Sequence, residues 1–445
     1  MHNSTMTTAN PSPPMAFDIP KSLVTWDVRS PIIFATQSII TAALICTTRK
    51  SSLLRPAVLP VLVWLMFRSW EAAPAFTGQG VLYSFWWVGP YANIFHCMNQ
   101  LCLYPLDSAD IKHEMRLQAT RKNAEKANGH TEKTSPGLFS QIWFTSAMLF
   151  SFRGIGTTHQ ISYIPAFPSG AVPSRIRFLT RQCFMILIQY LIMDVLASSP
   201  PPPDVVDSWA EGKEWLWISS LNKHAVTTTD LQNRFVGCAM NWFIVGRVMN
   251  DIWYRIFSFI FVGLGISKPE QWPPCYGNYN DTCSLRGYFG NMVANKRHLT
   301  GRRFWHQTVR WPFQGASSYF TRRILRLPQG VIERYANITV VFFLSGTLHS
   351  ILDIAFGGQY DPTGSLLCFG LLLPLGIIFE DTAQWAWRRA TGVRAGLFGR
   401  VVGHLWVALY LALVTPIFNY RLQRIPGNPT YLVPWSVISL MKKTF

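Results

Sequence analysis

Two histidines are the residues of this chain whose type and surroundings best suit chemistry, and the first is His349. It lies in the apolar run VVFFLSGTLHSILDIAF, residues 340–356, where an ionisable side chain is costly and is therefore a candidate for function. A neutral imidazole there can act as a general base toward a hydroxyl group. Asp353 follows four residues later, on the same helical face. The alternative interpretation of His349 is a hydrogen bond to a neighbouring helix.

The second histidine, His306, lies in GRRFWHQTVRW, residues 301–311, between a basic cluster and aromatic residues. By itself it is typical of a histidine at a membrane interface. Residues 296–326 contain eight Lys or Arg and no Asp or Glu. Such a basic stretch is typical of a cytoplasmic loop, so we expect residues 267–334 to lie on that side of the membrane.

The elements that must position these histidines are long apolar helices. Of 445 residues, 49% are hydrophobic and 14% are charged, whereas a soluble domain usually carries about a quarter charged residues. Because a helix needs about 20 residues to cross a bilayer, we expect an all-α, polytopic membrane helix bundle with about eight or nine transmembrane helices. The predicted spans are 31–47, 81–104, 178–197, 235–266, 336–356, 365–379 and 401–418, with weaker candidates at 56–67 and 138–152.

The sequence predicts a simple domain organisation. A polar N-terminal tail, residues 1–30, precedes a single membrane domain, residues 31–445, whose candidate chemistry gathers in residues 267–356. The first fifteen residues of the tail lack the basic start and apolar core of a cleavable signal peptide. We therefore expect the first membrane helix to target the chain.

The charge distribution indicates a lipid partner and argues against a nucleic acid. The net charge is +18, but the basic residues lie between apolar segments, as in cytoplasmic loops of membrane proteins. Polar stretches at 107–134 and 198–230 are further predicted connections, the second with a short interfacial helix around 209–217. The eight cysteines form no CxxC pair and mostly occur in apolar runs, so we expect no disulfide framework and no metal site.

Three segments, in order along the chain, carry a resemblance to a known family. They are Arg153-Gly154-Ile155-Gly156 followed by Pro165, Ser284-Leu285-Arg286-Gly287-Tyr288-Phe289-Gly290 followed by Phe304-Trp305-His306-Gln307, and Phe342-Phe343-Leu344-Ser345-Gly346-Thr347-Leu348-His349. Together they resemble the RGIGW…P, SLRxFWG…WHQ and FxxSGxxH elements of the wax-synthase-like branch of the membrane-bound O-acyltransferase superfamily. The resemblance is strongest to fungal members that acylate terpenoid and meroterpenoid products.

The sequence departs from the pattern of that family at two points. Thr157 stands where a tryptophan is usual. Residues 291–303 separate the SLR and WHQ halves, which are nearly contiguous in the family. These intervening residues are polar and basic, and they are either an added loop or retained intron sequence.

The resemblance implies transfer of an acyl group from acyl-CoA to an alcohol. His349 then corresponds to the catalytic histidine within the membrane, and His306 occupies a second catalytic position that bonds the thioester carbonyl. We expect no bound cofactor and no metal, because acyl-CoA is consumed as a co-substrate. The expected substrate-binding residues are Trp305, Gln307, Arg302, Arg303, Arg310, Ser345 and Asp353, with the three arginines near the CoA phosphates.

Three functional hypotheses stay open, and the first two are implied by the resemblance. The favoured one is transfer from acetyl-CoA to a hydroxyl group of a lipophilic secondary metabolite, such as a terpenoid or meroterpenoid, by a multi-pass protein of the endoplasmic reticulum. The second is a wax ester synthase that uses a long-chain acyl-CoA and a fatty alcohol. The third is a non-enzymatic membrane carrier of lipophilic compounds, which would not depend on His349.

Overall fold

The computed structural model describes residues 28–77, 85–125, 136–162, 164–167, 170–199, 201–215, 224–277, 279–289, 304–355, 363–392, 396–424, 433 and 436–444. Over this part of the chain every regular element is a helix, which confirms the predicted all-α fold. Most of the N-terminal tail and all of residues 291–303 lie outside the described residues.

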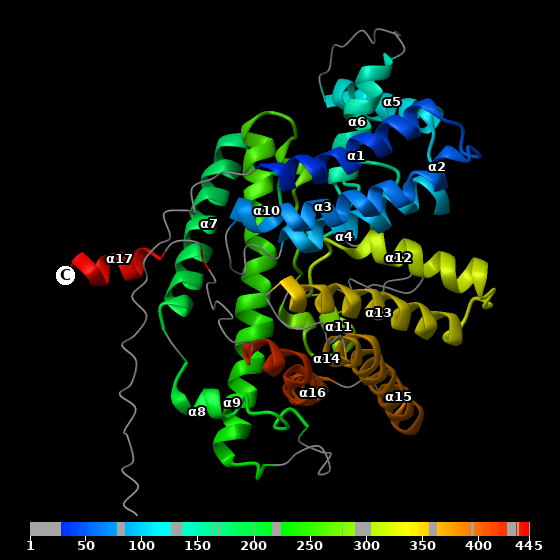
Figure 1. Cartoon of the computed structure of the whole chain (residues 1–445). Coiled ribbons are helices and arrows are strands. Elements are labelled where there is room, and N and C mark those ends of the chain that lie inside the picture. Colours follow the sequence, from blue (N-terminus) through cyan, green and yellow to red (C-terminus); the bar gives the residue numbers. More distant parts are fainter. Residues whose placement is uncertain are drawn as a thin grey trace, which may run out of the picture.

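Four N-terminal helices form one side of the bundle (Figure 1). They are α1 (Arg29–Thr47), α3 (Leu59–Thr77), α4 (Phe85–Met98) and α6 (Leu138–Phe150), and α1 packs against the other three. Buried amides join them, since Gln37 donates to the Leu62 carbonyl oxygen at 2.8 Å and Asn93 donates to Gln37 at 3.2 Å. Such bonds between helices satisfy polar groups that lipid cannot.

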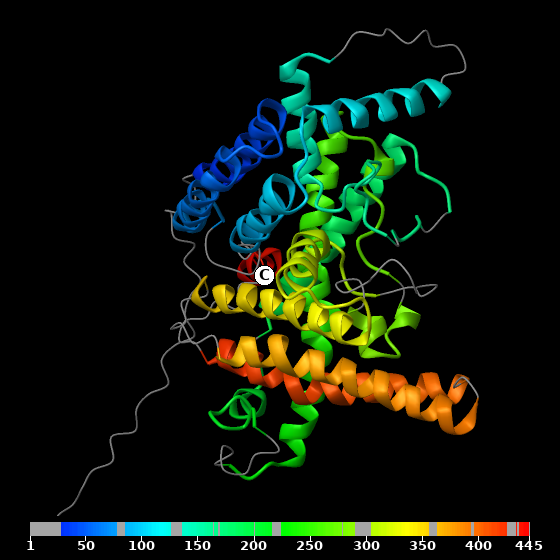
Figure 2. The same ribbon diagram turned by 90° about the vertical axis from the view of Figure 1, so that its right-hand side faces the viewer.

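A long helical rod runs nearly vertically beside these helices in both views (Figures 1 and 2). It consists of α9 (Thr228–Ala239), a π-helical turn η4 (Met240–Val245) and α10 (Gly246–Gly263). Thr227 and Asp230 begin it with a capping box, which satisfies free amides of the first turn. The rod packs against α7 (Arg175–Ala197), and the Gln189 amide donates to Asp251 at 2.6 Å.

The C-terminal helices pack around α13 (Val331–Ala355), which carries His349. Figure 2 shows α13 in yellow beside the orange helices that follow it. Gly346 allows this close packing, because a Cβ atom there would lie 3.2 Å from the Ser365 carbonyl oxygen. The neighbouring elements are α12 (Arg310–Tyr319), η7 (Phe320–Ile324), α14 (Thr363–Ser365), η8 (Leu366–Leu372), α15 (Leu373–Thr391) and α16 (Leu397–Gln423).

The remaining elements complete the described structure and correct one prediction, the short helix around 209–217. They are α2 (Leu54–Ala57), η3 (Asn99–Leu103), α5 (Ser108–Glu125), α8 (Pro203–Asp207), η5 (Pro269–Gln271), η6 (Tyr279–Asp281), α11 (Leu285–Phe289) and α17 (Val437–Thr444). The polar stretch 107–134 contains the helix α5. The short helix within 198–230 is α8, whereas residues 209–214 form turns. The basic region 267–334 contains α12, which buries Phe313 and packs against α4 and α13.

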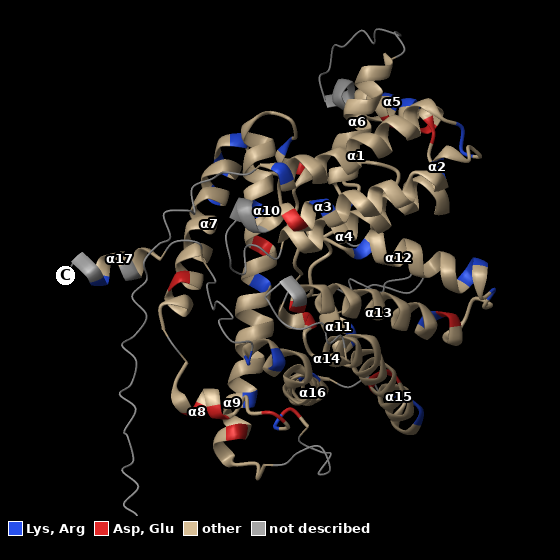
Figure 3. Cartoon of the chain, viewed as in Figure 1, with Lys and Arg blue, Asp and Glu red and all other residues tan. Residues whose placement is uncertain are grey.

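Five helices of the described structure are long and apolar enough to cross a membrane. They are α1, α7, α13, the run from α14 through α15, and α16. The total of eight or nine spans stays a prediction. Charged residues cluster where η7 ends and α13 begins (Figure 3), and Arg322 pairs there with Glu333 at 2.8 Å. Arg334, also near the start of α13, pairs with Asp381 in the middle of α15 at 3.3 Å.

Candidate functional site

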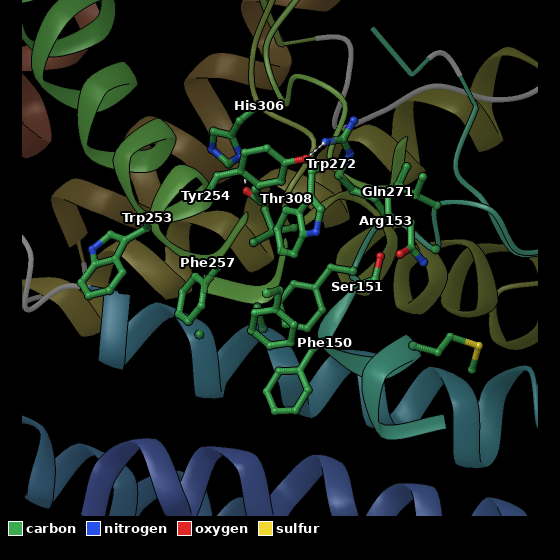
Figure 4. Close-up of a pocket in the computed structure, with 18 of the residues that line it drawn as sticks. Phe150, Ser151, Arg153, Trp253, Tyr254, Phe257, Gln271, Trp272, His306 and Thr308 are labelled. Carbon is green, nitrogen blue, oxygen red and sulfur yellow. Dashed lines mark hydrogen bonds between the residues drawn. The ribbon is translucent and has the colours of Figure 1, made fainter. Parts of the chain in front are cut away.

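A single cavity of about 880 Å³ contains both predicted catalytic histidines in its wall. It extends from α5 and α6, past the loop that follows α6, to α13 and η8. Figure 4 shows His306 near Thr308 and Tyr254, with Arg153 and Trp272 on the same cavity. Most of the wall is apolar and aromatic. Residues more than 190 positions apart in the chain, such as Arg153 and His349, therefore belong to one site.

His349 reaches the cavity from the C-terminal half of α13. Its ring lies flat against that of Phe369 of η8, with centroids 3.9 Å apart and an angle of 9° between the planes. Ser345, one turn earlier, also lines the cavity and is 7% exposed. The structure thus places His349 and Ser345 on the face of α13 that the sequence indicated.

Asp353 is not among the residues that line the cavity, and its expected role in substrate binding stays a prediction. Its Oδ2 accepts a hydrogen bond from the Ser365 hydroxyl at 3.2 Å. This bond joins α13 to α14, while His349 of the same helix faces the cavity.

The segment that carries His306 is fixed on both sides by backbone hydrogen bonds. Residues 275–277 lie along one side of it, and residues 287–288 at the end of α11 lie along the other. The four bonds run from Gly277 N to Phe304 O (2.9 Å), Gln307 N to Cys275 O (3.2 Å), Phe304 N to Gly287 O (3.1 Å) and Trp305 N to Tyr288 O (2.8 Å). The SLR and WHQ halves of the sequence signature are therefore direct neighbours in space.

The His306 side chain is 8% exposed and lines the cavity. Its Nδ1 lies 2.6 Å from the Thr308 hydroxyl oxygen. Burial, with a smaller contribution from His349, lowers the pKa of His306, which is outside the spans, to about 3. The imidazole is therefore neutral near pH 7. When the Thr308 hydroxyl donates to Nδ1, the ring proton lies on Nε2.

The other predicted residues of this segment divide into two groups. Trp305 lines the cavity beside His306. Gln307 is fully buried and Arg310 is 2% exposed, and neither lines the cavity. Arg310 donates to the Ser162 carbonyl oxygen at 2.8 Å. The expectation that Gln307 and Arg310 contact substrate is thus not supported by their positions.

The arginines predicted to bind the CoA phosphates are not the cationic residues that line the cavity in the described structure. Arg302 and Arg303 lie outside the described residues. Among the described residues, the cations that line the cavity are Arg153 and Lys268. The Lys268 side chain is half exposed and lies 3.8 Å from Glu270, so it marks a water-accessible rim.

Arg153, from the first sequence signature, supports the backbone next to the site through hydrogen bonds, and we call this role a brace. It is 4% exposed, and its guanidinium donates to the Tyr254 hydroxyl at 3.0 Å. The same group donates to the carbonyl oxygens of Pro273 and Pro274 at 2.8 and 2.9 Å. Because these prolines directly precede residues 275–277, Arg153 supports the backbone that holds His306.

Two residues of the site carried no signal in the sequence. Thr308 is an ordinary hydroxyl residue until the fold brings it to His306. Trp242 resembles the many tryptophans that anchor membrane helices, and its place on the cavity depends on η4. No group of three or more His, Cys, Asp or Glu residues that could hold a metal ion occurs in the described structure.

Comparison with known proteins places these features in context. The model of the membrane bound O-acyl transferase family matches residues 272–371, which include both histidines. Acetyltransferase pyr8 of Aspergillus fumigatus is 30% identical over 95% of this chain and 94% of its own. Acetyltransferase ataH of Aspergillus terreus is 38% identical over 65% of this chain and 92% of its own.

A third relative, acetyltransferase TRI7 of Fusarium sporotrichioides, is 30% identical over 78% of this chain and 75% of its own. No solved structure matches the chain. The similarity to these relatives extends well beyond the signature segments, because the alignment with pyr8 covers nearly the whole length of both proteins.

Proposed function

Because this chain belongs to the membrane bound O-acyl transferase family, we propose that it transfers an acetyl group from acetyl-CoA to a hydroxyl group of a lipophilic secondary metabolite, such as a terpenoid or meroterpenoid. The comparisons confirm the predicted family and the predicted acyltransferase activity, and they favour an enzyme over a carrier. The names of the three relatives support acetyl as the transferred group. The apolar cavity supports a lipophilic acceptor.

The observation that carries this proposal is the shared cavity of His306 and His349. The acceptor hydroxyl loses its proton to a ring nitrogen of His349 as its oxygen bonds to the thioester carbon. The carbonyl oxygen becomes negative in that step. The C–S bond then breaks, the carbonyl re-forms, and the CoA thiolate takes the proton from His349. The products are an ester and free CoA, and the base returns to its neutral state.

His306 is assigned to stabilise the negative charge that develops on the carbonyl oxygen. With Thr308 donating to Nδ1, the Nε2–H group is available to donate to the carbonyl oxygen. Such a donor is most effective when it is fixed in place before the reaction. The paired backbone on both sides of His306 supports this requirement.

The remaining roles follow from position in the cavity. Trp305 and Ser345 lie beside the histidines and are assigned to contact the reacting groups. Lys268 at the rim, together with Arg302 and Arg303, is assigned to the CoA phosphates. The steps use no metal or bound cofactor. Catalysis inside a bilayer also keeps water from the thioester, and we assign the protein to the endoplasmic reticulum membrane.

A direct test compares microsomes from cells that express wild-type protein or His349→Ala. The microsomes receive acetyl-CoA or palmitoyl-CoA with an extract of lipophilic alcohols, and mass spectrometry detects the esters. We expect acetate esters from wild type and none above background from His349→Ala. His404→Ala, an exposed position on α16 outside the cavity, is the matched control and should retain activity.

Three outcomes would contradict parts of this proposal. Palmitate esters without acetate esters would support the wax ester synthase predicted from the sequence. If ester formation persisted in His349→Ala, His349 would not be the general base. The absence of any ester, together with retained binding of lipophilic compounds, would favour a carrier.

A further inference from the structure

We propose that Trp242 closes the inner end of the cavity directly beside the two histidines and thereby restricts the acyl donor to short chains. This inference rests on the proposed function, because it assumes that acyl-CoA binds with its carbonyl between His306 and His349. It adds a specificity-determining residue that lies outside all three sequence signatures. The argument starts from the way in which the helix holds this indole.

Trp242 lies in the π-helical turn η4 between α9 and α10. A π-helical turn changes the direction of side chains relative to a regular α-helix and is frequent at functional sites. The indole is 4% exposed, and its Nε1–H donates to the Thr415 hydroxyl of α16 at 2.7 Å. The ring is therefore fixed by one hydrogen bond as well as by packing.

Trp242 is the central member of an aromatic floor, which we define as Trp242, Phe289, Trp305, Phe342 and Phe369. All five line the cavity and are at most 7% exposed. The ring centroid of Trp242 lies 5.3 Å from Phe289, 5.3 Å from Trp305 and 6.1 Å from Phe369. The floor thus joins side chains from separate parts of the chain.

Packed side chains lie behind the aromatic floor. Tyr288 and Phe418 are each 6.2 Å from Trp242, centroid to centroid, and are 0% and 6% exposed. Neither of them lines the cavity. In the described structure, the cavity therefore stops at the floor on this side, and densely packed interiors leave little room for extra methylene groups.

Both histidines contact the aromatic floor. The ring of His306 lies 5.2 Å from that of Trp305, and the ring of His349 lies 3.9 Å from that of Phe369. A thioester carbonyl carbon bears an oxygen, a sulfur and an alkyl group. Its oxygen turns toward His306, and its sulfur leads toward the rim, where water can solvate the CoA phosphates. The alkyl group then faces the floor.

This arrangement accommodates a methyl group and penalises longer chains. In a hydrophobic pocket, a single methylene group changes discrimination by on the order of 10- to 200-fold. Replacing the indole of Trp242 with the smaller side chain of leucine opens space beside the reacting carbon. The variant should therefore accept longer alkyl groups without any change in the histidines.

The test measures binding of unreactive CoA thioethers to purified protein in detergent. S-ethyl-CoA and S-hexyl-CoA serve as probes, and binding is measured by calorimetry for wild type and Trp242→Leu. We expect wild type to prefer S-ethyl-CoA and Trp242→Leu to shift the affinity ratio toward S-hexyl-CoA by on the order of tenfold or more. The matched control is Trp64→Leu, an exposed tryptophan on α3 outside the cavity, which should keep the wild-type ratio.

A second variant, Phe289→Leu, removes a ring of α11 from the aromatic floor and enlarges the space there. It replaces Trp242→Leu in the test if that variant does not fold. The inference would be overturned if wild type bound both thioethers with equal affinity. It would also be overturned if a folded Trp242→Leu or Phe289→Leu protein kept the wild-type ratio of the two affinities. Because thioether binding requires no chemistry, this result is independent of ester formation. If the affinity ratios are as expected but no ester forms, the role of the aromatic floor stands and the proposed function is contradicted.

Discussion

At the scale of single residues, the site depends on neutral imidazoles held away from water. His349 could be identified in the sequence because a histidine in apolar surroundings is costly to bury and therefore marks a candidate site, whereas His306 was identified through the resemblance of its segment to the WHQ element. Gln307, Arg310 and Asp353 were expected to meet substrate, yet none of them lines the cavity. Sequence spacing places residues near one another along a helix or loop. The direction of each side chain depends on tertiary packing that a single sequence does not display.

In the proposed mechanism the Thr308 hydroxyl donates to Nδ1 of His306 and keeps the ring proton on Nε2, so its removal should slow catalysis. In Thr308→Val, the hydroxyl that donates to Nδ1 is gone and the Nε2–H form loses its support. We expect the turnover rate for ester formation to fall on the order of 100-fold, with little change in KM for acetyl-CoA. Thr308→Ser retains a hydroxyl and should restore most of the rate. Equal rates for the valine and serine variants would contradict this role.

The lowered pKa of His306 predicts how folding stability depends on pH. The unfolded histidine has a pKa of about 6.5, whereas the folded pKa is about 3. Above pH 6.5 both states are neutral and the group contributes no pH dependence. As pH falls from 6.5 toward 3, the unfolded state binds more protons than the folded state. The free energy of unfolding therefore decreases by at most about 1.4 kcal/mol per pH unit.

Thermal unfolding in detergent at pH 7 and pH 5 checks this prediction. His306→Gln lacks the titrating group but keeps a polar side chain of similar size. The midpoint should therefore fall more between the two pH values in wild type than in His306→Gln. An identical fall in both proteins would show that the pKa of His306 is the same in the folded and unfolded states, which would contradict its lowered value.

At the scale of elements, long apolar runs were predictable and local irregularities were not. The runs at 31–47, 178–197 and 401–418 correspond to α1, α7 and α16 with small shifts at their ends. The helix α5 was not predicted because it has no apolar stripe. The turn η4 was also not predicted, since a π-helical turn leaves no pattern in the residues that form it. The turn η4 carries Trp242, and α5 contributes Met115 and Gln118 to the cavity wall.

The loop that follows α6 supports the element that carries His306, and Arg153 connects the two. Lysine at position 153 cannot donate to three oxygens in the fixed planar geometry of a guanidinium. We expect Arg153→Lys to lower the turnover rate on the order of 10- to 100-fold, because small displacements of catalytic groups are costly. Initial rates at saturating acetyl-CoA measure this effect.

The matched control for Arg153→Lys is Arg177→Lys, an exposed arginine on α7. That change should leave the rate and the thermal midpoint near wild-type values. If Arg153→Lys raised KM for acetyl-CoA without lowering the turnover rate, Arg153 would contact the substrate and would not act as a brace.

At the scale of the whole molecule, the fold brings distant segments of a membrane bundle to one cavity. Composition was sufficient to predict a polytopic helix bundle, because lipid requires apolar helices that satisfy their own backbone. The resemblance of three segments predicted which residues would gather. It did not predict that residues 275–277 and 287–288 would enclose the segment of His306, because such pairing depends on the relative placement of loops. The central claim is that His306 and His349 act together on one reacting group.

A double-mutant cycle tests that claim most directly. Rates of acetyl ester formation are measured for wild type, His306→Ala, His349→Ala and the double variant, each at matched protein levels. Groups that act as a unit in one transition state have strongly non-additive effects. We therefore predict that each single change lowers the rate by on the order of 100-fold or more, and that the double variant is no slower than the slower single variant. A double variant whose loss equals the product of the two single losses, or a His306→Ala protein with the wild-type rate, would contradict the account.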